Sequence, residues 1–550
     1  MSGLLLRRAR LGTAVRDVLV TAGRVVAIAD DLSGGAPGLD RLPDGVEVVD
    51  LDGAVLLPGL RDAHVHLEQW AAARRRIDVS TAGSAEQVAA MIAAVVAAAP
   101  PAGDAVVVAQ GFRDALWTTG PDAAVLDAAL PGLPVVVVSG DLHTAWCSTA
   151  AVRWLGLRTA DGVLREHEAM RVYAAAESAG PDVRDEWVLA ATDAAAARGV
   201  TAVVDLEFDD LVTSWVRRAA LRPGGPAVRV AAGVYVDRLD DVLAAGLRSG
   251  DPLPGLTDPV AADRVRLGPL KVFVDGSLGT RTAYCSHAYP GVTGPEAHGL
   301  LRTPPAELER LLRRASAAGL DLAVHAIGDR ATAVALDGFA AVGAPGRIEH
   351  AQQVADRDLP RFAELGVVAS VQPRHAVDDR DAADLHWAGA TGTAFPYGAL
   401  AGAGAELALG SDAPVAALDP WDGIAAAVHR SLDERAAWHP EQHLDLAVAL
   451  RAASGGRDAV RVGDVADLVV VAEPPATVLA RDGAAGLRTT EVLATLVGGR
   501  FTHRGGELGQ GRLRTTGGRG ARSRVGSPAQ EPSAPGGEGA RVAGAGPAGP

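Results

Sequence analysis

Two histidines separated by one residue follow an apolar run near the start of the chain. His64 and His66 lie in LLPGLRDAHVHLEQW, residues 56–70, shortly after the Pro-Gly break at residues 58–59. On a β-strand this spacing places both side chains on the same face. Two imidazoles on one face at the end of a strand can bind a metal ion. The pair alone is weak evidence, because a His-x-His sequence more often belongs to a surface loop.

Further polar residues lie in, or at the end of, four later apolar runs. These are Lys271 in PLKVFVDGS, His325 in LAVHAIGD, His350 in RIEHAQQ and Asp412 in LALGSDAPV. Taken alone, each has an ordinary structural explanation. The two histidines can be hydrogen-bonded core residues, and the lysine can extend from a strand end towards water. The aspartate can belong to a turn or a helix N-cap.

The strands expected in the middle of the chain would bring these residues together. Short β-branched runs alternate there with Ala-, Leu- and Arg-rich helical stretches, and most later runs recur every ~25–40 residues, as βα units do. The expected strands are LLPGLRDAHVHL and residues 199–206, 228–236, 265–276, 320–329, 346–354, 366–375 and 405–415. Eight parallel βα units predict an α/β fold with a (β/α)8 barrel of TIM type. The active site of such a barrel lies at the C-terminal ends of its strands. All six polar residues are therefore expected to meet on that rim of the barrel as a metal-ligand set.

Other parts of the chain are expected to form separate units. Residues 1–57 and 456–504 contain short β-rich runs punctuated by Gly and Asp, which predicts one small β-sandwich domain built from both ends. The barrel is expected over residues 58–455, with an inserted subdomain at about 70–198. Residues 505–550 are rich in Gly, Pro, Ser and Arg and contain no aromatic residue, so they are predicted to be disordered.

Composition excludes several classes of function. The formal net charge of −15 argues against nucleic acid as a partner, since phosphate binding needs clustered Lys and Arg. The two cysteines, Cys147 and Cys285, allow neither a disulfide framework nor a Cys-based zinc site. No uncharged apolar run approaches the ~20 residues that span a bilayer, so no membrane partner is expected. These features together predict a cytoplasmic protein.

The stretches that carry the polar residues resemble the amidohydrolase superfamily, and within it the amidohydrolase-3 or YtcJ-like branch. The resemblance runs from about residue 3 to about residue 503. Its most specific stretches are KVFVDGSLGTRTA and HAIGDRA, and LLPGLRDAHVHL, SGDLHTAWCSTAAV, RIEHAQ and LGSDAPV agree with it. The segment before the final β-run departs from the family pattern, because it is contracted to RAASGGRDAVRVGDVADLVVV. This segment leads from the barrel back into the small β-domain, so the departure bears on stability more than on the site.

The resemblance implies a centre with two divalent metal ions. His64 and His66, together with Asp412, would hold the more buried ion, and His325 and His350 would hold the second. Zn²⁺ is the expected metal, since imidazole and carboxylate ligands suit it, and iron and manganese are the alternatives.

The resemblance also implies a reaction. Lys271 would be carboxylated on its amine and bridge both ions. A hydroxide between the ions would be the nucleophile, because two cations lower the pKa of water. Asp412 would take its proton and pass it to the leaving nitrogen. The implied reaction is hydrolysis of a non-peptide carbon–nitrogen bond, an amide above all, in a small-molecule substrate.

Some features stay open at this stage. His143, Trp146, Arg281 and His375 lie near the expected mouth of the barrel, where they could contact substrate or equally well pack and cap loops. A mononuclear deaminase of the same superfamily is an alternative, although it would need no bridging carbamate. A non-catalytic, barrel-based binding protein is another, although it would be expected to have lost ligand residues. The substrate, and whether the chain forms a homo-oligomer, are also open.

Removal of the C-terminal segment is expected to leave the rest of the protein intact, because its Gly- and Pro-rich composition offers no core. A chain that ends near residue 503 should keep the melting temperature and the activity of the full-length chain. Calorimetric melting of the two proteins side by side checks this. A loss of several degrees would show that the segment packs against the rest.

Overall fold

The computed structural model describes residues 3–35, 42, 45–101, 106–114, 117–140, 144–165, 168–169, 171–172, 180–432 and 434–505. All of them belong to one compact unit. His143 and the segment 506–550, which the sequence predicts to be disordered, lie outside the described residues.

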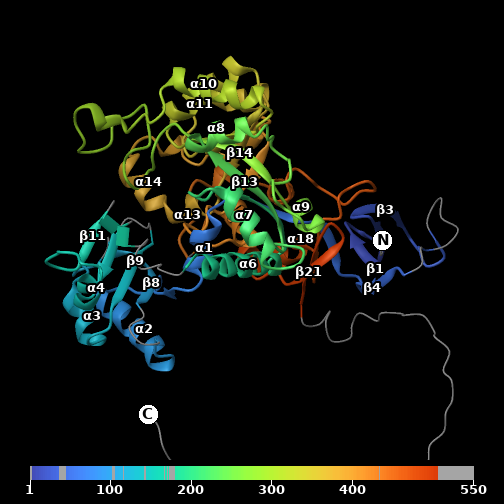
Figure 1. Cartoon of the computed structure of the whole chain (residues 1–550). Helices are drawn as coiled ribbons and strands as arrows, with labels where there is room; N and C mark the ends of the chain where they lie inside the picture. The colour runs from blue at the N-terminus through green and yellow to red at the C-terminus, as the bar shows by residue number, and fades with distance from the viewer. Residues whose placement is uncertain are drawn as a thin grey trace, which may run out of the picture. The chain divides into compact units, whose positions relative to one another are not determined.

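Eight parallel strands form a nearly closed barrel in the middle of the chain (Figure 1). In spatial order they are β6 (Leu60–Val65), β12 (Val200–Asp205), β13 (Arg229–Tyr235), β14 (Val265–Phe273), β15 (Leu322–Ala326), β16 (Gly346–His350), β17 (Val367–Val371) and β18 (Leu407–Leu409). A parallel bridge between Val65 and Ala413 joins the last strand region to the first. The arrangement confirms the predicted TIM-type barrel, and each predicted run contains one of these strands.

Helices connect the barrel strands. They are α1 (Leu67–Ala73), α6 (Pro181–Ala197), α7 (Leu211–Ala220), α8 (Leu239–Ala244), α9 (Pro259–Arg264), α10 (Pro305–Ala317), α11 (Asp329–Val342), α12 (Leu359–Leu365), α13 (His375–Asp378), α14 (Arg380–His386), α15 (Tyr397–Gly402), α16 (Pro420–His429) and α17 (Leu446–Ala453). The longer ones carry a buried apolar stripe, as Leu308, Leu311, Leu312 and Ala315 do in α10. This i, i+3, i+4 spacing is what a helix needs to cover one side of a sheet.

Strands from both ends of the chain pair in one further sheet. Its order is β21 (Arg500–Arg504), β20 (Val492–Val497), β19 (Leu468–Val471), β5 (Val55–Pro58), β1 (Leu4–Leu11), β2 (Ala14–Thr21) and β3 (Arg24–Ala29), and β4 (Glu47–Asp50) also pairs with β1. Leu6 and Leu496 from distant strands share one buried cluster. Arg24 of β3 also bridges to Val465, just before β19, so the sheet curls back around this cluster. We call it the composite sheet, and helix α18 (Pro475–Arg488) lies between β19 and β20 in the chain.

A third sheet lies in the insertion between β6 and β12. Its order is β11 (Val163–Arg165), β10 (Thr144–Cys147), β9 (Val135–Ser139), β8 (Val107–Phe112) and β7 (Ile77–Asp78), and its helices are α2 (Ala85–Ala98), α3 (Ala123–Ala129) and α4 (Thr149–Trp154). In β9, Val135 and Val137 pack in one cluster, whereas Val136 and Val138 pack in another. Since successive side chains of a strand point to opposite faces, this sheet is covered on both sides.

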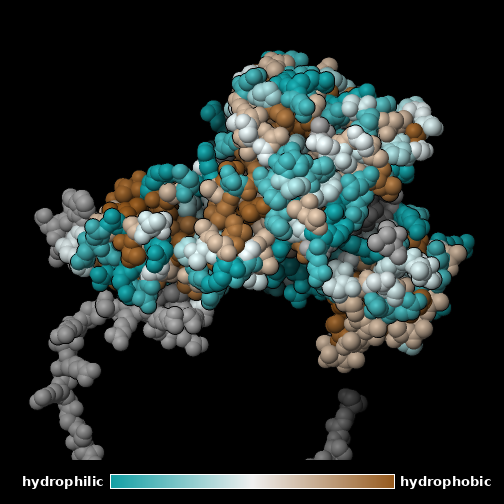
Figure 2. All heavy atoms as spheres, turned by 180° about the vertical axis from the view of Figure 1, so that it is seen from behind, coloured by the Kyte–Doolittle hydropathy of each residue, from teal (hydrophilic) through white to brown (hydrophobic). Residues whose placement is uncertain are grey.

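Hydrophilic residues cover most of the face shown in Figure 2, and hydrophobic residues gather there in a few patches. Among the helices of the described residues, none combines the length and apolar character that crossing a bilayer requires.

Gly59 connects the composite sheet to the barrel, and its position explains the Pro-Gly break before the two histidines. Its N–H donates to the carbonyl of Asp467 at 2.9 Å, next to β19. A Cβ at this position would collide with the side chain of Thr201 in β12. Glycine therefore lets β6 approach β12 closely enough to begin the barrel.

Gly59→Ala is expected to destabilise the protein by about 1–3 kcal/mol, because the added methyl group overpacks the contact with Thr201. Chemical denaturation of wild type and variant measures the difference. Gly120→Ala is the matched control, since a Cβ there meets no atom within 4 Å. Equal stability of wild type and Gly59→Ala would contradict this account of the strand connection.

Candidate metal centre

The six residues singled out in the sequence lie at or near the C-terminal ends of five barrel strands. His64 lies in β6 and His66 directly follows it; Lys271 lies in β14, His325 in β15, His350 ends β16, and Asp412 follows β18. The parallel order of the strands therefore places all six on one rim.

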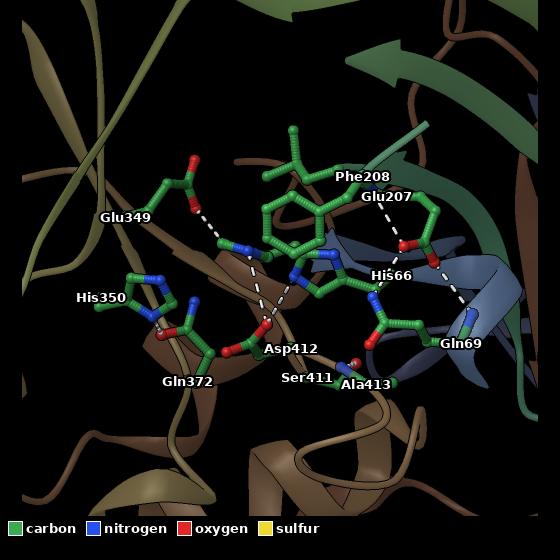
Figure 3. A network of polar contacts seen from close by, with 12 residues as sticks. His66, Gln69, Glu207, Phe208, Glu349, His350, Gln372, Ser411, Asp412 and Ala413 are labelled. Atoms are coloured by element: carbon green, nitrogen blue, oxygen red, sulfur yellow. Dashed lines mark hydrogen bonds and ion pairs between the residues drawn. The ribbon is translucent and has the colours of Figure 1, made fainter. Parts of the chain in front are cut away.

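Asp412 lies close to both histidines of the His-x-His pair. Its Oδ1 is 3.5 Å from Nε2 of His64 and 3.3 Å from Nε2 of His66. Figure 3 shows the carboxylate of Asp412 pointing towards the ring of His66. One possible ligand atom each from His64, His350 and Asp412 lies within 4.8 Å of the others. These three residues are thus spaced for ligation of a common ion.

Lys271 and His325 complete the cluster. Nζ of Lys271 is 3.5 Å from Nε2 of His64. The ring centroid of His325 is 4.5 Å from that of His350, which in turn lies 4.8 Å from that of His64. All six predicted ligands are therefore brought together, and every one is at least nine-tenths buried.

The backbone is unusual at two of these residues. His350 has a φ of 75° and Asp412 a φ of 55°, in the left-handed region that non-glycine residues rarely adopt. The side chain of Asp412 does not cap the next helix, because Asp419 caps α16 by accepting from the N–H of Trp421. The helix N-cap explanation of Asp412 is therefore wrong, and its carboxylate is directed at the histidines instead.

Hydrogen bonds on the outer side of the rings set the orientation of three histidines. Nδ1 of His64 contacts Oε2 of Glu349 at 2.8 Å, and Nδ1 of His350 contacts Oε1 of Gln372 at 2.9 Å. Nε2 of His325 contacts the carbonyl of Gly276 at 3.2 Å. When one ring nitrogen donates outward, the other presents its lone pair to the cluster, as metal-binding histidines require.

Burial favours the neutral form of three imidazoles, whereas at His66 the hydrogen bond and charge of Asp412 outweigh burial and raise the pKa. Burial and then the charge of Lys271 lower the pKa of His64 to about 4 and that of His325 to about 3. Burial also lowers the pKa of His350 well below its ordinary value. Neutral imidazole is the form that ligates metals. Burial lowers the pKa of Lys271 to about 8, so a fraction of its amine is neutral near physiological pH.

The carboxylates, by contrast, are held ionised. Burial works to raise the pKa of Glu349, but Arg347 and His64 outweigh it and hold the value at about 2. Burial likewise opposes ionisation of Asp412, whereas His64 and His66 hold its pKa well below the usual range. The site thus combines three neutral imidazoles with anionic oxygen.

The donor set fits a divalent transition metal. Nδ1 of His325, the ring nitrogen that does not contact Gly276, is buried and has no hydrogen-bond partner within the described part of the chain. Unpaired buried nitrogen atoms are costly unless a ligand satisfies them. Imidazole and carboxylate donors together suit Zn²⁺ and related ions.

Glu349 and Gln372 contact two of the expected ligands, and neither was among the residues predicted from the sequence. Both contact an expected ligand through its outer ring nitrogen, and both are buried. Glu349 directly precedes His350 in RIEHAQ, and Gln372 lies in VQPRH. A carboxylate within the predicted strand 346–354, next to an expected ligand, was the available signal for Glu349.

Three of the four weaker candidates are among the described residues, and they lie in different surroundings. Nε2 of His375 is 3.9 Å from Oδ2 of Asp412, and its ring stacks on His350 at 6.3 Å, so His375 belongs to the cluster. Trp146 is fully buried in the core of the inserted sheet, against Phe112. Arg281 is exposed in the loop after β14, with a φ of 58°. Contact of either residue with substrate stays a prediction.

An aromatic surface borders the cluster. Phe208 is 63% exposed and stacks on His66 at 5.1 Å. It also stacks on Tyr235 at 5.2 Å and on Phe273 at 6.1 Å. Beside it, the side chain of Gln69 donates to Glu207 at 2.7 Å (Figure 3). The cluster is therefore flanked by flat apolar rings on one side.

Known proteins resemble this chain over most of its length. The protein LONG AFTER FAR-RED 3 of Arabidopsis thaliana is 30% identical over 83% of this chain and 84% of its own length. YtcJ of Bacillus subtilis is 27% identical over 74% and 80%, respectively. An N-substituted formamide deformylase from Arthrobacter pascens is 25% identical over 88% and 94%.

A solved structure and a family model agree with these relatives. A metal-dependent hydrolase from Pyrococcus horikoshii superposes with a TM-score of 0.68 at 24% identity, covering 86% of this chain and 98% of that one, and so shares its fold. The model of the amidohydrolase family matches residues 47–503. The chain therefore belongs to the amidohydrolase family, in its amidohydrolase-3 or YtcJ-like branch, and this membership supports a metal-dependent hydrolase.

Proposed function

We propose that the protein hydrolyses a non-peptide carbon–nitrogen bond, an amide, in a small-molecule substrate, with Asp412 as the proton shuttle. The observation that carries this proposal is the position of the Asp412 carboxylate, 3.3 to 3.9 Å from the ring nitrogens of three histidines. The relative that deformylates N-substituted formamides supports an amide as the substrate class.

The proposed cofactor is a pair of divalent ions, Zn²⁺ in the first place, held by His64, His66, His325, His350 and Asp412. Such ions lower the pKa of water and polarise a carbonyl. Lys271 is proposed to carry a carboxyl group on Nζ. Carboxylation needs a neutral amine, which bonds to the carbon of CO₂ and loses a proton, and the pKa of about 8 for Lys271 makes that form accessible.

The chain's own residues then have separate tasks. Asp412 is ionised, so it can accept a proton as water attacks the amide carbon and return that proton to the departing nitrogen. Glu349 accepts from Nδ1 of His64 and holds its ring in one orientation. Phe208 supports an apolar substituent of the substrate through its exposed ring face.

Lys271 separates this proposal from the mononuclear alternative. A lysine that bridges two ions has a role only in a binuclear centre, and its Nζ lies 3.5 Å from Nε2 of His64, inside the cluster. The non-catalytic alternative is disfavoured because all six ligand residues are present and converge.

Metal analysis is expected to give about two transition-metal ions per chain. Protein prepared with ample zinc and bicarbonate is measured by elemental analysis beside Lys271→Ala and Arg310→Ala. The Lys271 variant should bind fewer ions because it lacks the bridge. Arg310 is exposed on α10 and pairs with Glu307, so its removal should change nothing. A reproducible value near one in wild type would favour the mononuclear alternative.

Asp412→Asn should keep the fold and most of the metal but lose about 10²–10⁴ in turnover, because an amide cannot accept the proton. The substrate for this assay comes from a screen of N-substituted formamides, N-acyl amines, cyclic ureas and imides. Asp210→Asn is the matched control, since Asp210 caps α7 and asparagine caps equally well. Turnover of Asp412→Asn within about threefold of wild type, with metal retained, would rule out the shuttle.

A further inference from the structure

A large cavity lies at the opposite end of the barrel from the candidate metal centre. Its volume is about 1090 Å³, and its lining comes from the composite sheet, α9 and the N-terminal ends of barrel strands. Arg229 begins β13, and Arg266 lies near the start of β14. Lys271 follows five residues later, which is roughly 16 Å along an extended strand. The cavity is therefore separate from the metal centre.

The lining of this cavity is strongly basic. It contains eight arginines but only three carboxylates, those of Glu47, Asp263 and Asp467. This local excess of positive charge stands out in a chain whose formal net charge is −15. We call this feature the arginine cavity.

The three carboxylates are already paired. Asp467 accepts from Nε of Arg229 and from the N–H of Gly498, each at 2.7 Å. Asp263 pairs with Arg229 at 2.8 Å. Glu47 pairs with Arg504 at 2.6 Å. These contacts leave no free carboxylate in the lining to neutralise the other arginines.

Five arginines of the lining have no carboxylate partner among the described residues: Arg24, Arg61, Arg264, Arg457 and Arg500. Arg24, Arg264 and Arg457 donate to backbone carbonyls only. Within the described part of the chain, Arg61 and Arg500 make neither a side-chain hydrogen bond nor an ion pair. Five guanidinium groups of the lining therefore lack a direct carboxylate contact, and the charge of Asp467 acts on Arg61 and Arg457 without contact.

Burial makes the charge of Arg264 costly, whereas Arg24, Arg61 and Arg500 are exposed and Arg457 is half-buried. Arg264 is only 8% exposed. Burial, and then the charges of Arg229 and Arg500, lower its pKa to about 10. Burial and then the charge of Arg61 lower the pKa of Arg457 as well. A buried guanidinium beside other positive charges is unfavourable unless a counter-charge satisfies it, so Arg264 and the excess of arginines over carboxylates in the lining favour a bound anion.

We propose that the arginine cavity binds a small phosphate-bearing anion with at least two negative charges. Guanidinium groups match the oxygens of a phosphate through paired hydrogen bonds, and they stay charged when buried. The volume exceeds what one inorganic phosphate fills, so a phosphate ester or a pyrophosphate is the expected class.

The test uses the full-length protein in calorimetric titrations with two probes, pyrophosphate and adenosine monophosphate. At least one probe should bind saturably, and added sodium chloride should weaken the binding. Arg61→Gln and Arg500→Gln should each weaken it by about tenfold or more, because each removes charge-assisted hydrogen bonds. Tighter binding of adenosine monophosphate would identify an ester as the ligand, and tighter binding of pyrophosphate an inorganic anion.

Arg310→Gln is the matched control, since this exposed arginine on α10 lies outside the cavity and pairs with Glu307. Pyrophosphate can also chelate metal, but chelation at the metal centre affects wild type and all variants alike. Arg500 is exposed at the start of β21, so its variant tests the proposal even if Arg61→Gln fails to fold. The proposal is overturned if neither probe binds, or if both variants bind as tightly as wild type.

Discussion

The backbone contact that closes the barrel is the constraint on which the site depends. The N–H of Asp412 donates to the carbonyl of His64 at 2.8 Å, and the N–H of His66 donates to the carbonyl of Ala413 at 2.9 Å. A Cβ on Gly410 would lie 2.7 Å from the N atom of His64, so only glycine allows this approach. Two hydrogen bonds thus fix the first and the last ligand segments of the barrel against each other.

A layer of buried carboxylates supports that contact. Asp62 accepts from the N–H groups of His64 and Ser411, which tie β6 to the segment after β18. Burial raises its pKa to about 6. Asp275 accepts from the N–H groups of Ile327 and Gly328 after β15. These carboxylates fix the backbone segments that carry the ligands. The ligand side chains are therefore held in place by hydrogen-bonded backbone.

Features that depend on the residue types within a short stretch of chain could be predicted from the sequence. Strand runs are marked by β-branched residues, and ligand candidates by polar residues at their ends, so the barrel and the converging set of six could be predicted. Glu349 and Gln372 were missed because their role depends on which ring nitrogen they reach, and spacing along the chain does not encode that. Trp146 illustrates a second limit. Its core position follows from the pairing of β10 with β9 inside the insertion, which local pattern does not fix.

The two ends of the barrel differ in charge and in the ligand they suit. The same strands contribute arginines to the arginine cavity at one end and metal ligands to the candidate centre at the other. In β6, Arg61 lines the arginine cavity, whereas His64 lies three residues later in the metal centre. In β14, Arg266 likewise lines the arginine cavity, and Lys271 lies in the metal centre. A ligand can change activity at a distance only if it favours one of two arrangements of an element between the sites. The strands between the two sites are paired and buried, and they have one arrangement. An anion in the arginine cavity is therefore expected to stabilise the folded state, because it binds that state and not the unfolded chain. It is expected to leave the geometry of the metal centre unchanged.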